Sequence, residues 1–117
     1  MSYAQKLETI QSLQTCLQRS RDNCFVLMFR GETEKAQEIQ QKNEALNEEI
    51  DRLISNAMSD WTKEAGEVTK EVKKANATLQ RAITGIKKQQ KEAENVTKAF
   101  GIVDEVLSIA RTLLAAI

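Results

Sequence analysis

The pattern of apolar and polar positions is most distinctive in the last nineteen residues, 99–117. At about 100° per residue, the strongly polar side chains of this segment fall within an arc of roughly 120° of a helix. These side chains are Asp104, Glu105, Ser108, Arg111 and Thr112. The rest of the helix is apolar and carries Phe100, Ile102, Val103, Val106, Leu107, Ile109, Leu113, Leu114 and Ile117. Because a two-helix seam needs a much narrower stripe, we expect this segment to contact at least two neighbouring helices, a second chain or lipid.

The N-terminal pattern predicts an amphipathic helix over residues 3–29. Its apolar positions recur at spacings of three, four or seven, and they are Tyr3, Leu7, Ile10, Leu13, Leu17, Cys24 and Met28. The stretch 24–29 is apolar on all sides, so we expect this end to be enclosed more completely than the rest. The residues that follow predict a tight turn, in which Gly31 adopts a left-handed conformation and Thr33 caps the next helix.

Heptad spacing predicts a second helix over 33–58 and a third over 60–98. The seam of the second helix is Ile39, Asn43, Leu46, Ile50, Leu53 and Ala57. Its polar member, Asn43, either fixes the register of packing or lies at a solvated helix end. Ser59 or Asp60 is expected to begin the third helix, and one unbroken helix is the alternative. The third stripe is rich in alanine and consists of Trp61, Ala65, Val68, Val72, Ala75, Leu79, Ala82 and Ile86.

A segment that is polar all round, 87–92, lies between Gly85 and Gly101. Here the chain either bends back into a fourth helix or projects beyond the bundle as one rod. A fourth helix of about 25 residues would complete an ordinary four-helix bundle, in which the apolar end of the first helix and the start of the last could cover each other. The absence of proline also favours uninterrupted helices. We therefore predict a single all-α domain over 1–117, an antiparallel bundle of three or four long helices with coiled-coil-like packing.

Charge separates by segment. Residues 32–60 contain three basic and eight acidic side chains, whereas residues 61–98 contain nine basic and five acidic ones. This difference predicts antiparallel pairing of the second and third helices, with opposite charges side by side. The basic cluster has no interleaved aromatic residues, and the chain has no net charge, so nucleic acid is not an expected partner. That cluster is Lys73, Lys74, Lys87, Lys88 and Lys91.

The chain offers little for catalysis, because it has no histidine, no glycine-rich phosphate loop and no Cys-x-x-Cys pair. Cys16 and Cys24 are separated by about 12 Å along a helix, too far for an intrahelical disulfide. We interpret them as small buried hydrophobic residues, with pairing between subunits as the alternative. Four carboxylates are expected to form a solvated acidic face: Glu44, Glu48, Glu49 and Asp51. No cofactor, metal, small-molecule substrate or enzymatic activity is expected.

Trp61 lies at the predicted second turn, followed by Thr62 and Lys63. This arrangement resembles the Trp-x-Gly turn of the small secreted helical hairpins of ESX or type VII systems. The glycine is absent here, and the helix over 3–29 has no counterpart in those hairpins. The resemblance covers about half of the chain, and it implies a helical hairpin at this turn. From the residues alone, Trp61 is expected to be a core anchor at the end of the bundle rather than a ligand platform.

These observations predict a non-enzymatic helical interaction or assembly module that self-associates or binds another helical protein. Its expected contact residues are Phe100, Val103, Val106, Leu107, Ile109, Leu113 and Leu114, with Phe25 and Phe29 as neighbours. The runner-up is a membrane-acting helical protein of amphipathic or pore-forming type. An adaptor, chaperone or immunity protein of a secretion system or toxin is a further alternative. No secretory signal is visible, so a cytoplasmic location is expected, and export by a route independent of a signal peptide stays open.

Overall fold

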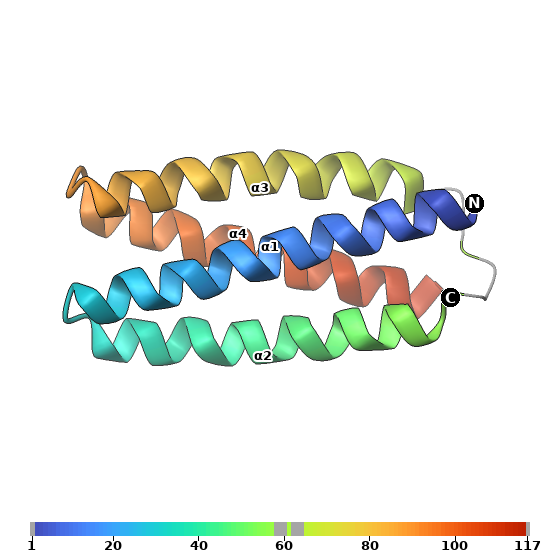
Figure 1. The fold of residues 1–117 in the computed structure, drawn as a ribbon, viewed down its shortest axis with the longest axis horizontal. Helices are drawn as coiled ribbons and strands as arrows, with labels where there is room; N and C mark the ends of the chain where they lie inside the picture. Colours follow the sequence, from blue (N-terminus) through green and yellow to red (C-terminus); the bar gives the residue numbers. More distant parts are fainter. Residues whose placement is uncertain (1, 58–60, 62–64, 117) are drawn as a thin grey trace.

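The computed structural model is an antiparallel bundle of long helices that measures 44 × 21 × 17 Å (Figure 1). The structure describes residues 2–57, 61 and 65–116. Within these residues there are four helices and no strand: α1 (Tyr3–Phe29), α2 (Thr33–Ser55), α3 (Ala65–Lys87) and α4 (Glu92–Ala116). The predicted all-α antiparallel bundle is confirmed, and its chain bends back into a fourth helix.

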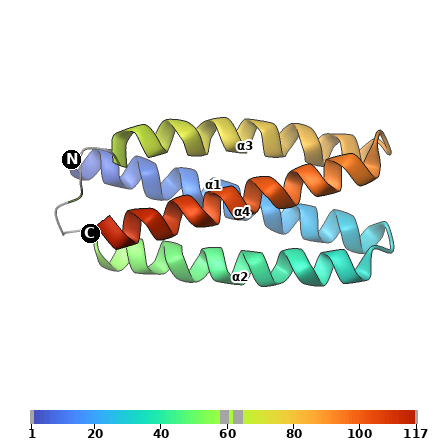
Figure 2. The same cartoon turned by 180° about the vertical axis from the view of Figure 1, so that it is seen from behind.

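The four helices occupy the corners of a square. α1 packs against α2 and α3, and α4 lies at the opposite corner, where it packs against the same two helices (Figure 2). In contrast, the described parts of α2 and α3 are diagonal and do not contact each other. The predicted pairing of the second and third helices is therefore wrong. The broad apolar arc of α4 explains the arrangement, because it needs a neighbour on each flank and is inserted between α2 and α3.

The turn between α1 and α2 is confirmed at Gly31, whose φ is 76°. The Gly31 amide donates to Met28 O, and the Glu32 amide donates to Leu27 O at 2.9 Å. This pair of bonds is the Schellman motif, which favours glycine at the left-handed position. The capping prediction is wrong, because α2 begins at Thr33 itself and the cap residue Glu32 makes no side-chain cap bond.

The predicted helix over 60–98 is also wrong, because α3 ends at Lys87 and the chain reverses before α4. The Gln89 amide donates to Ile86 O and the Gln90 amide to Gly85 O, the same pattern of bonds that ends α1. Here Gln89, with a φ of 58°, takes the position that glycine takes in the first turn. A left-handed conformation is uncommon for glutamine, so no glycine marks the position of this turn within the polar segment 87–92.

Between α2 and α3 the predicted start at Ser59 or Asp60 lies outside the described residues. α2 ends at Ser55 with Asn56 as its cap residue, so one unbroken helix is wrong. Trp61 is buried, and its Nε1 donates to Asn56 O at 2.9 Å. This burial confirms Trp61 as a core anchor at the end of the bundle.

The core follows the predicted stripes of α2 and α3. On α2 the apolar seam is buried at Ile39, Leu46, Ile50 and Leu53. On α3 the buried residues of the predicted stripe are Val72, Ala75, Leu79, Ala82 and Ile86. The exception among the expected solvated carboxylates is Glu49, which is buried and pairs with Arg52 at 3.2 Å and with Arg111 of α4 at 3.8 Å.

Polar side chains interrupt the buried face of α1 to an extent that the sequence pattern did not reveal. Five of the buried polar side chains belong to this helix: Lys6, Thr9, Ser12, Ser20 and Asn23. Thr9 shares a hydrogen bond with Thr69 of α3, and Ser20 donates to Asn43 of α2. Because Asn43 is buried on the seam, its placement at a solvated helix end is wrong.

Candidate protein-interaction surface

The apolar arc of α4 lies mostly in the bundle's own core. Five of its residues are buried: Ile102, Val103, Val106, Leu107 and Leu113. Three more are half-buried against that core: Phe100, Ile109 and Leu114. The polar strip opposite is exposed, as the sequence predicted, at Asp104, Glu105, Ser108, Arg111 and Thr112. The neighbouring helices α2 and α3 thus cover most of the surface that the sequence marked for contact.

The end of α1 is left uncovered. Phe25 is 63% exposed, Met28 58% and Phe29 92%, and we call these three residues the aromatic patch. The expected enclosure of this end is wrong, and the start of α4 does not cover it. The reason is geometric, because α1 has neighbours only on the side of Leu27, which is fully buried, while the patch lies on the outward side of the same two turns.

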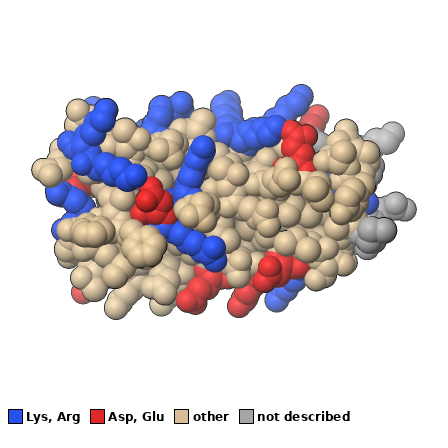
Figure 3. All heavy atoms as spheres, viewed as in Figure 1, with Lys and Arg blue, Asp and Glu red and all other residues tan. Residues whose placement is uncertain are grey.

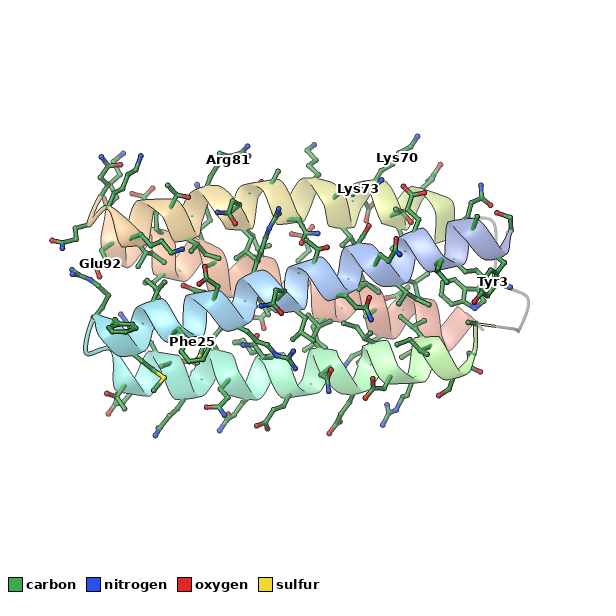
Figure 4. The ribbon with its side chains drawn as sticks, in the orientation of Figure 1. Tyr3, Phe25, Lys70, Lys73, Arg81 and Glu92 are labelled. Atoms are coloured by element: carbon green, nitrogen blue, oxygen red, sulfur yellow. The ribbon has the colours of Figure 1, made fainter. Side chains whose placement is uncertain are left out.

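The patch continues into a groove between α1 and α2 with a volume of about 500 Å³. Figure 4 shows Phe25 projecting from α1 on the side facing the viewer. The α1 wall consists of Arg21, Cys24, Phe25 and Met28, and the α2 wall consists of Gln40, Asn43, Glu44 and Asn47. The groove therefore has aromatic and thioether side chains along one wall and polar side chains along the other, with one cation and one carboxylate among them. An apolar centre within a polar rim is typical of protein interfaces.

An ion pair joins the two turns beside this surface. Arg30 donates from Nε to Oε1 of Glu92 at 2.6 Å and from a terminal nitrogen to Oε2 at 2.7 Å. These two parallel hydrogen bonds lower the pKa of the Glu92 carboxyl and raise the pKa of the Arg30 guanidinium. Glu92 is the first residue of α4, so the pair connects the end of α1 to the start of α4.

The two cysteines are free and occupy different environments. Cys16 is fully buried, and desolvation raises the pKa of its thiol to about 12, so the thiol stays protonated at neutral pH. Cys24 is half-buried beside the groove and donates from Sγ to Ala36 O at 3.4 Å. Burial also raises the pKa of Cys24. Both environments favour the thiol over the reactive thiolate.

Residues 2–57, 61 and 65–116 contain no group of three or more His, Cys, Asp or Glu side chains placed to hold a metal ion. No helix in this part of the chain combines the length and apolar character needed to cross a membrane. Comparisons with protein-family models, curated proteins and solved structures found no match to this chain.

Proposed function

We propose that this protein is a non-enzymatic helical interaction module that binds protein through the aromatic patch of α1. The observation that supports this proposal is the exposure of Phe25, Met28 and Phe29 on adjacent turns. Since an aromatic side chain buries about 150–250 Å² in an interface, the patch presents an apolar surface on the order of 400 Å². Apolar patches of that size on a monomer are often functional.

This proposal moves the binding surface away from the C-terminal arc. In the closed bundle, Val103 and Val106 are fully buried, so a partner would reach them only after α4 had separated from α2 and α3. Such separation would expose the core of the whole domain to water. The aromatic patch requires no opening of the bundle.

The partner that the patch of one molecule binds is, in this proposal, the same patch of a second copy of the chain. Arg21 and Glu44 line the same groove as Phe25 and Met28, so each copy offers both a cation and a carboxylate beside an apolar centre. In a two-fold arrangement the same patch meets itself, and Arg21 of each copy can face Glu44 of the other. Another helical protein is the alternative partner.

Sedimentation velocity at physiological salt, over a wide range of protein concentrations, tests the proposal. We expect the unmodified protein to dimerise and the variant Phe25→Ser/Phe29→Ser to stay monomeric. The matched control is Tyr3→Ser/Ile54→Ser, which removes two other exposed apolar side chains outside the patch and leaves dimerisation unchanged. Equal monomeric behaviour of all three proteins would overturn self-association through the patch.

Co-sedimentation with liposomes addresses the membrane-acting alternative. An amphipathic surface helix binds lipid through an exposed apolar face, and the exposed apolar face here is the aromatic patch. We expect no binding to liposomes that contain anionic lipid. Binding that is lost in Phe25→Ser/Phe29→Ser would instead make the patch a membrane anchor and contradict the proposal.

A further inference from the structure

The diagonal placement of α2 and α3 puts opposite charges on opposite edges of the molecule. α2 contains six acidic and three basic residues, whereas α3 contains five basic and two acidic ones. Lys88 and Lys91 extend the basic edge into the next turn. In Figure 3 basic side chains follow the upper edge, over α3, and acidic side chains gather along the lower edge, over α2. The molecule therefore has an acidic edge and a basic edge, although its net charge is zero.

On the acidic edge the cations are already engaged. Lys42 pairs with Asp104 of α4 at 2.6 Å, and Lys35 and Arg52 pair with neighbouring carboxylates. Five exposed carboxylates of α2 make no ion pair with any described residue: Glu34, Glu38, Glu44, Glu48 and Asp51. At about 100° per residue these five span an outward arc of roughly 140°.

The basic edge mirrors this arrangement. Lys73 and Lys87 turn toward α1, where they pair with Glu8 and Asp22. Five other exposed cations of α3 and its turn make no ion pair with any described residue: Lys70, Lys74, Arg81, Lys88 and Lys91. At about 100° per residue the positions of Lys70, Lys74 and Arg81 fall within about 40° of one another. Lys70 and Arg81 are seen pointing away from the bundle in Figure 4.

The geometry points to a second copy of this chain as the partner of each edge, with α2 of one copy against α3 of the next. α2 begins at the end of the bundle where α3 finishes, so copies in the same orientation bring these helices together antiparallel (Figure 1). This contact is heterologous, and repetition gives an open row of molecules. The charge complementarity that the sequence predicts between the second and third helices of one chain is then formed between two chains.

The spacing of the charges along the two helices agrees with this docking. At about 1.5 Å per residue, Glu38 lies about 8 Å from the start of α2, and Arg81 about 9 Å from the end of α3. On the same scale Glu48 and Lys74 lie at about 23 and 20 Å, and Asp51 and Lys70 at about 27 and 26 Å. Three opposite charges on each helix therefore match in position along the axis, with Glu48 near the middle of the acidic arc and with Glu38 and Asp51 at its two sides.

Features of the basic edge favour a copy of the chain over a nucleic acid. The ridge of Lys70, Lys74 and Arg81 contains no aromatic side chain on which a base could stack. The same helix also carries the exposed carboxylates Glu67 and Glu71, which repel phosphates. A matching acidic edge, in contrast, is present on every copy of the chain.

Individual exposed ion pairs are weak, so the assembly is expected to be weak and sensitive to salt. Sedimentation velocity at low ionic strength tests it with two variants of exposed residues. One reverses the acidic edge, Glu38→Lys/Glu48→Lys/Asp51→Lys, and the other reverses the basic edge, Lys70→Glu/Lys74→Glu/Arg81→Glu. We expect the unmodified protein to assemble progressively with concentration and each variant alone to bind itself at least about tenfold more weakly.

Mixing the two variants supplies the decisive measurement. One then has two basic edges and the other has two acidic edges, so an equimolar mixture is expected to regain assembly. A protein that carries all six reversals has exchanged its edges and is expected to assemble alone. Far-ultraviolet circular dichroism verifies that each variant is helical. About 0.5 M salt is expected to disperse the assembly between the charged edges and to leave the association through the aromatic patch.

Three results would overturn the inference: an unmodified protein that assembles no further at low salt than at physiological salt, a mixture that assembles no further than either variant alone, or a basic edge that binds a polynucleotide instead. The inference does not depend on the aromatic patch. Phe25→Ser/Phe29→Ser should retain the salt-sensitive assembly while losing the association that persists at physiological salt, so the two proposals fail separately.

Discussion

The end of α1 and the length of α4 have similar sequences and different surroundings. Both are apolar around most of the helix, and both were expected to be enclosed. α4 lies between α2 and α3 along its length, whereas the last two turns of α1 expose Phe25, Met28 and Phe29. The comparison shows that a broad apolar arc identifies a helix whose apolar surface must be shielded from water by other residues. Whether the chain supplies that cover depends on where its turns place the helix.

The largest effect is expected when a carboxylate is placed in each region, because one region is buried and the other is exposed. Val103→Asp puts an unpaired charge where the side chain is fully buried, and we expect the free energy of unfolding to fall by about 3–5 kcal/mol. Phe29→Asp, on the exposed end of α1, should change it by less than about 0.5 kcal/mol. Urea denaturation followed by circular dichroism measures both. Similar losses in the two variants would show that the end of α1 is covered after all.

A second test concerns the inward side of the same α1 segment. Asn23 is fully buried, and neither its amide nitrogen nor its oxygen has a hydrogen-bond partner among the described residues. Replacing it with leucine of similar size removes this cost, so Asn23→Leu should raise the free energy of unfolding by about 1–2 kcal/mol. Asn43→Leu is the control and should lower it, because Ser20 would lose its acceptor. A loss of stability in Asn23→Leu would contradict this interpretation.

A smaller effect is expected at two glycines, Gly85 in the last turn of α3 and Gly101 in the interior of α4. At Gly101 an added methyl group meets open space, so Gly101→Ala should raise the free energy of unfolding by about 0.5–1 kcal/mol through helix propensity. At Gly85 the methyl group would lie 2.2 Å from Nδ2 of Asn95, whose hydrogen bond to Gln90 O would break. Gly85→Ala should therefore gain less or lose stability. Equal gains in thermal denaturation would show that the turn tolerates the displacement.

The smallest expected effect is the pH dependence of the ion pair between the two regions. Arg30 lowers the pKa of Glu92, so the folded state binds this proton less readily than the unfolded state. The stabilisation is present at neutral pH and is lost as the pH falls through the folded pKa. Glu92→Gln should thus unfold at slightly lower urea concentration than the unmodified protein at pH 7, and at the same concentration near pH 2. A difference that persists in acid would assign the effect to something other than this carboxylate.

The fold was largely predictable because its signals are local and periodic. The seam of Ile39, Leu46 and Ile50 and the glycine turn at Gly31 both appear where the sequence placed them. The exact position of the turn at Gln89 was not predictable, because glutamine here adopts the left-handed conformation that glycine usually adopts. The diagonal arrangement of α2 and α3 was missed as well, since charge patterns do not say whether complementary helices meet within a chain or between chains.

The candidate surface was predicted less well than the fold. Phe25 and Phe29 were named as neighbours of a C-terminal binding face, and they form the exposed patch, while the residues expected to bind are mostly core. The periodicity does not show that the end of α1 is exposed and the C-terminal arc is buried, because exposed and buried aromatic residues look alike in sequence. The polar residues on the inner side of α1, such as Ser20 and Asn23, were the available hint that this helix does not bury its apolar residues in the usual way.

The buried polar contacts of α1 also fix the register of the helices along the bundle axis. Thr9 meets Thr69 near one end of the helix, and Ser20 meets Asn43 beyond its midpoint. An apolar interface alone tolerates sliding, but a hydroxyl displaced by one helical step of about 1.5 Å loses its partner in a medium that offers no replacement. α1 therefore fixes the positions of α2 and α3 along the bundle axis. The alignment of the charges on these two helices thus depends on buried hydroxyl groups of α1.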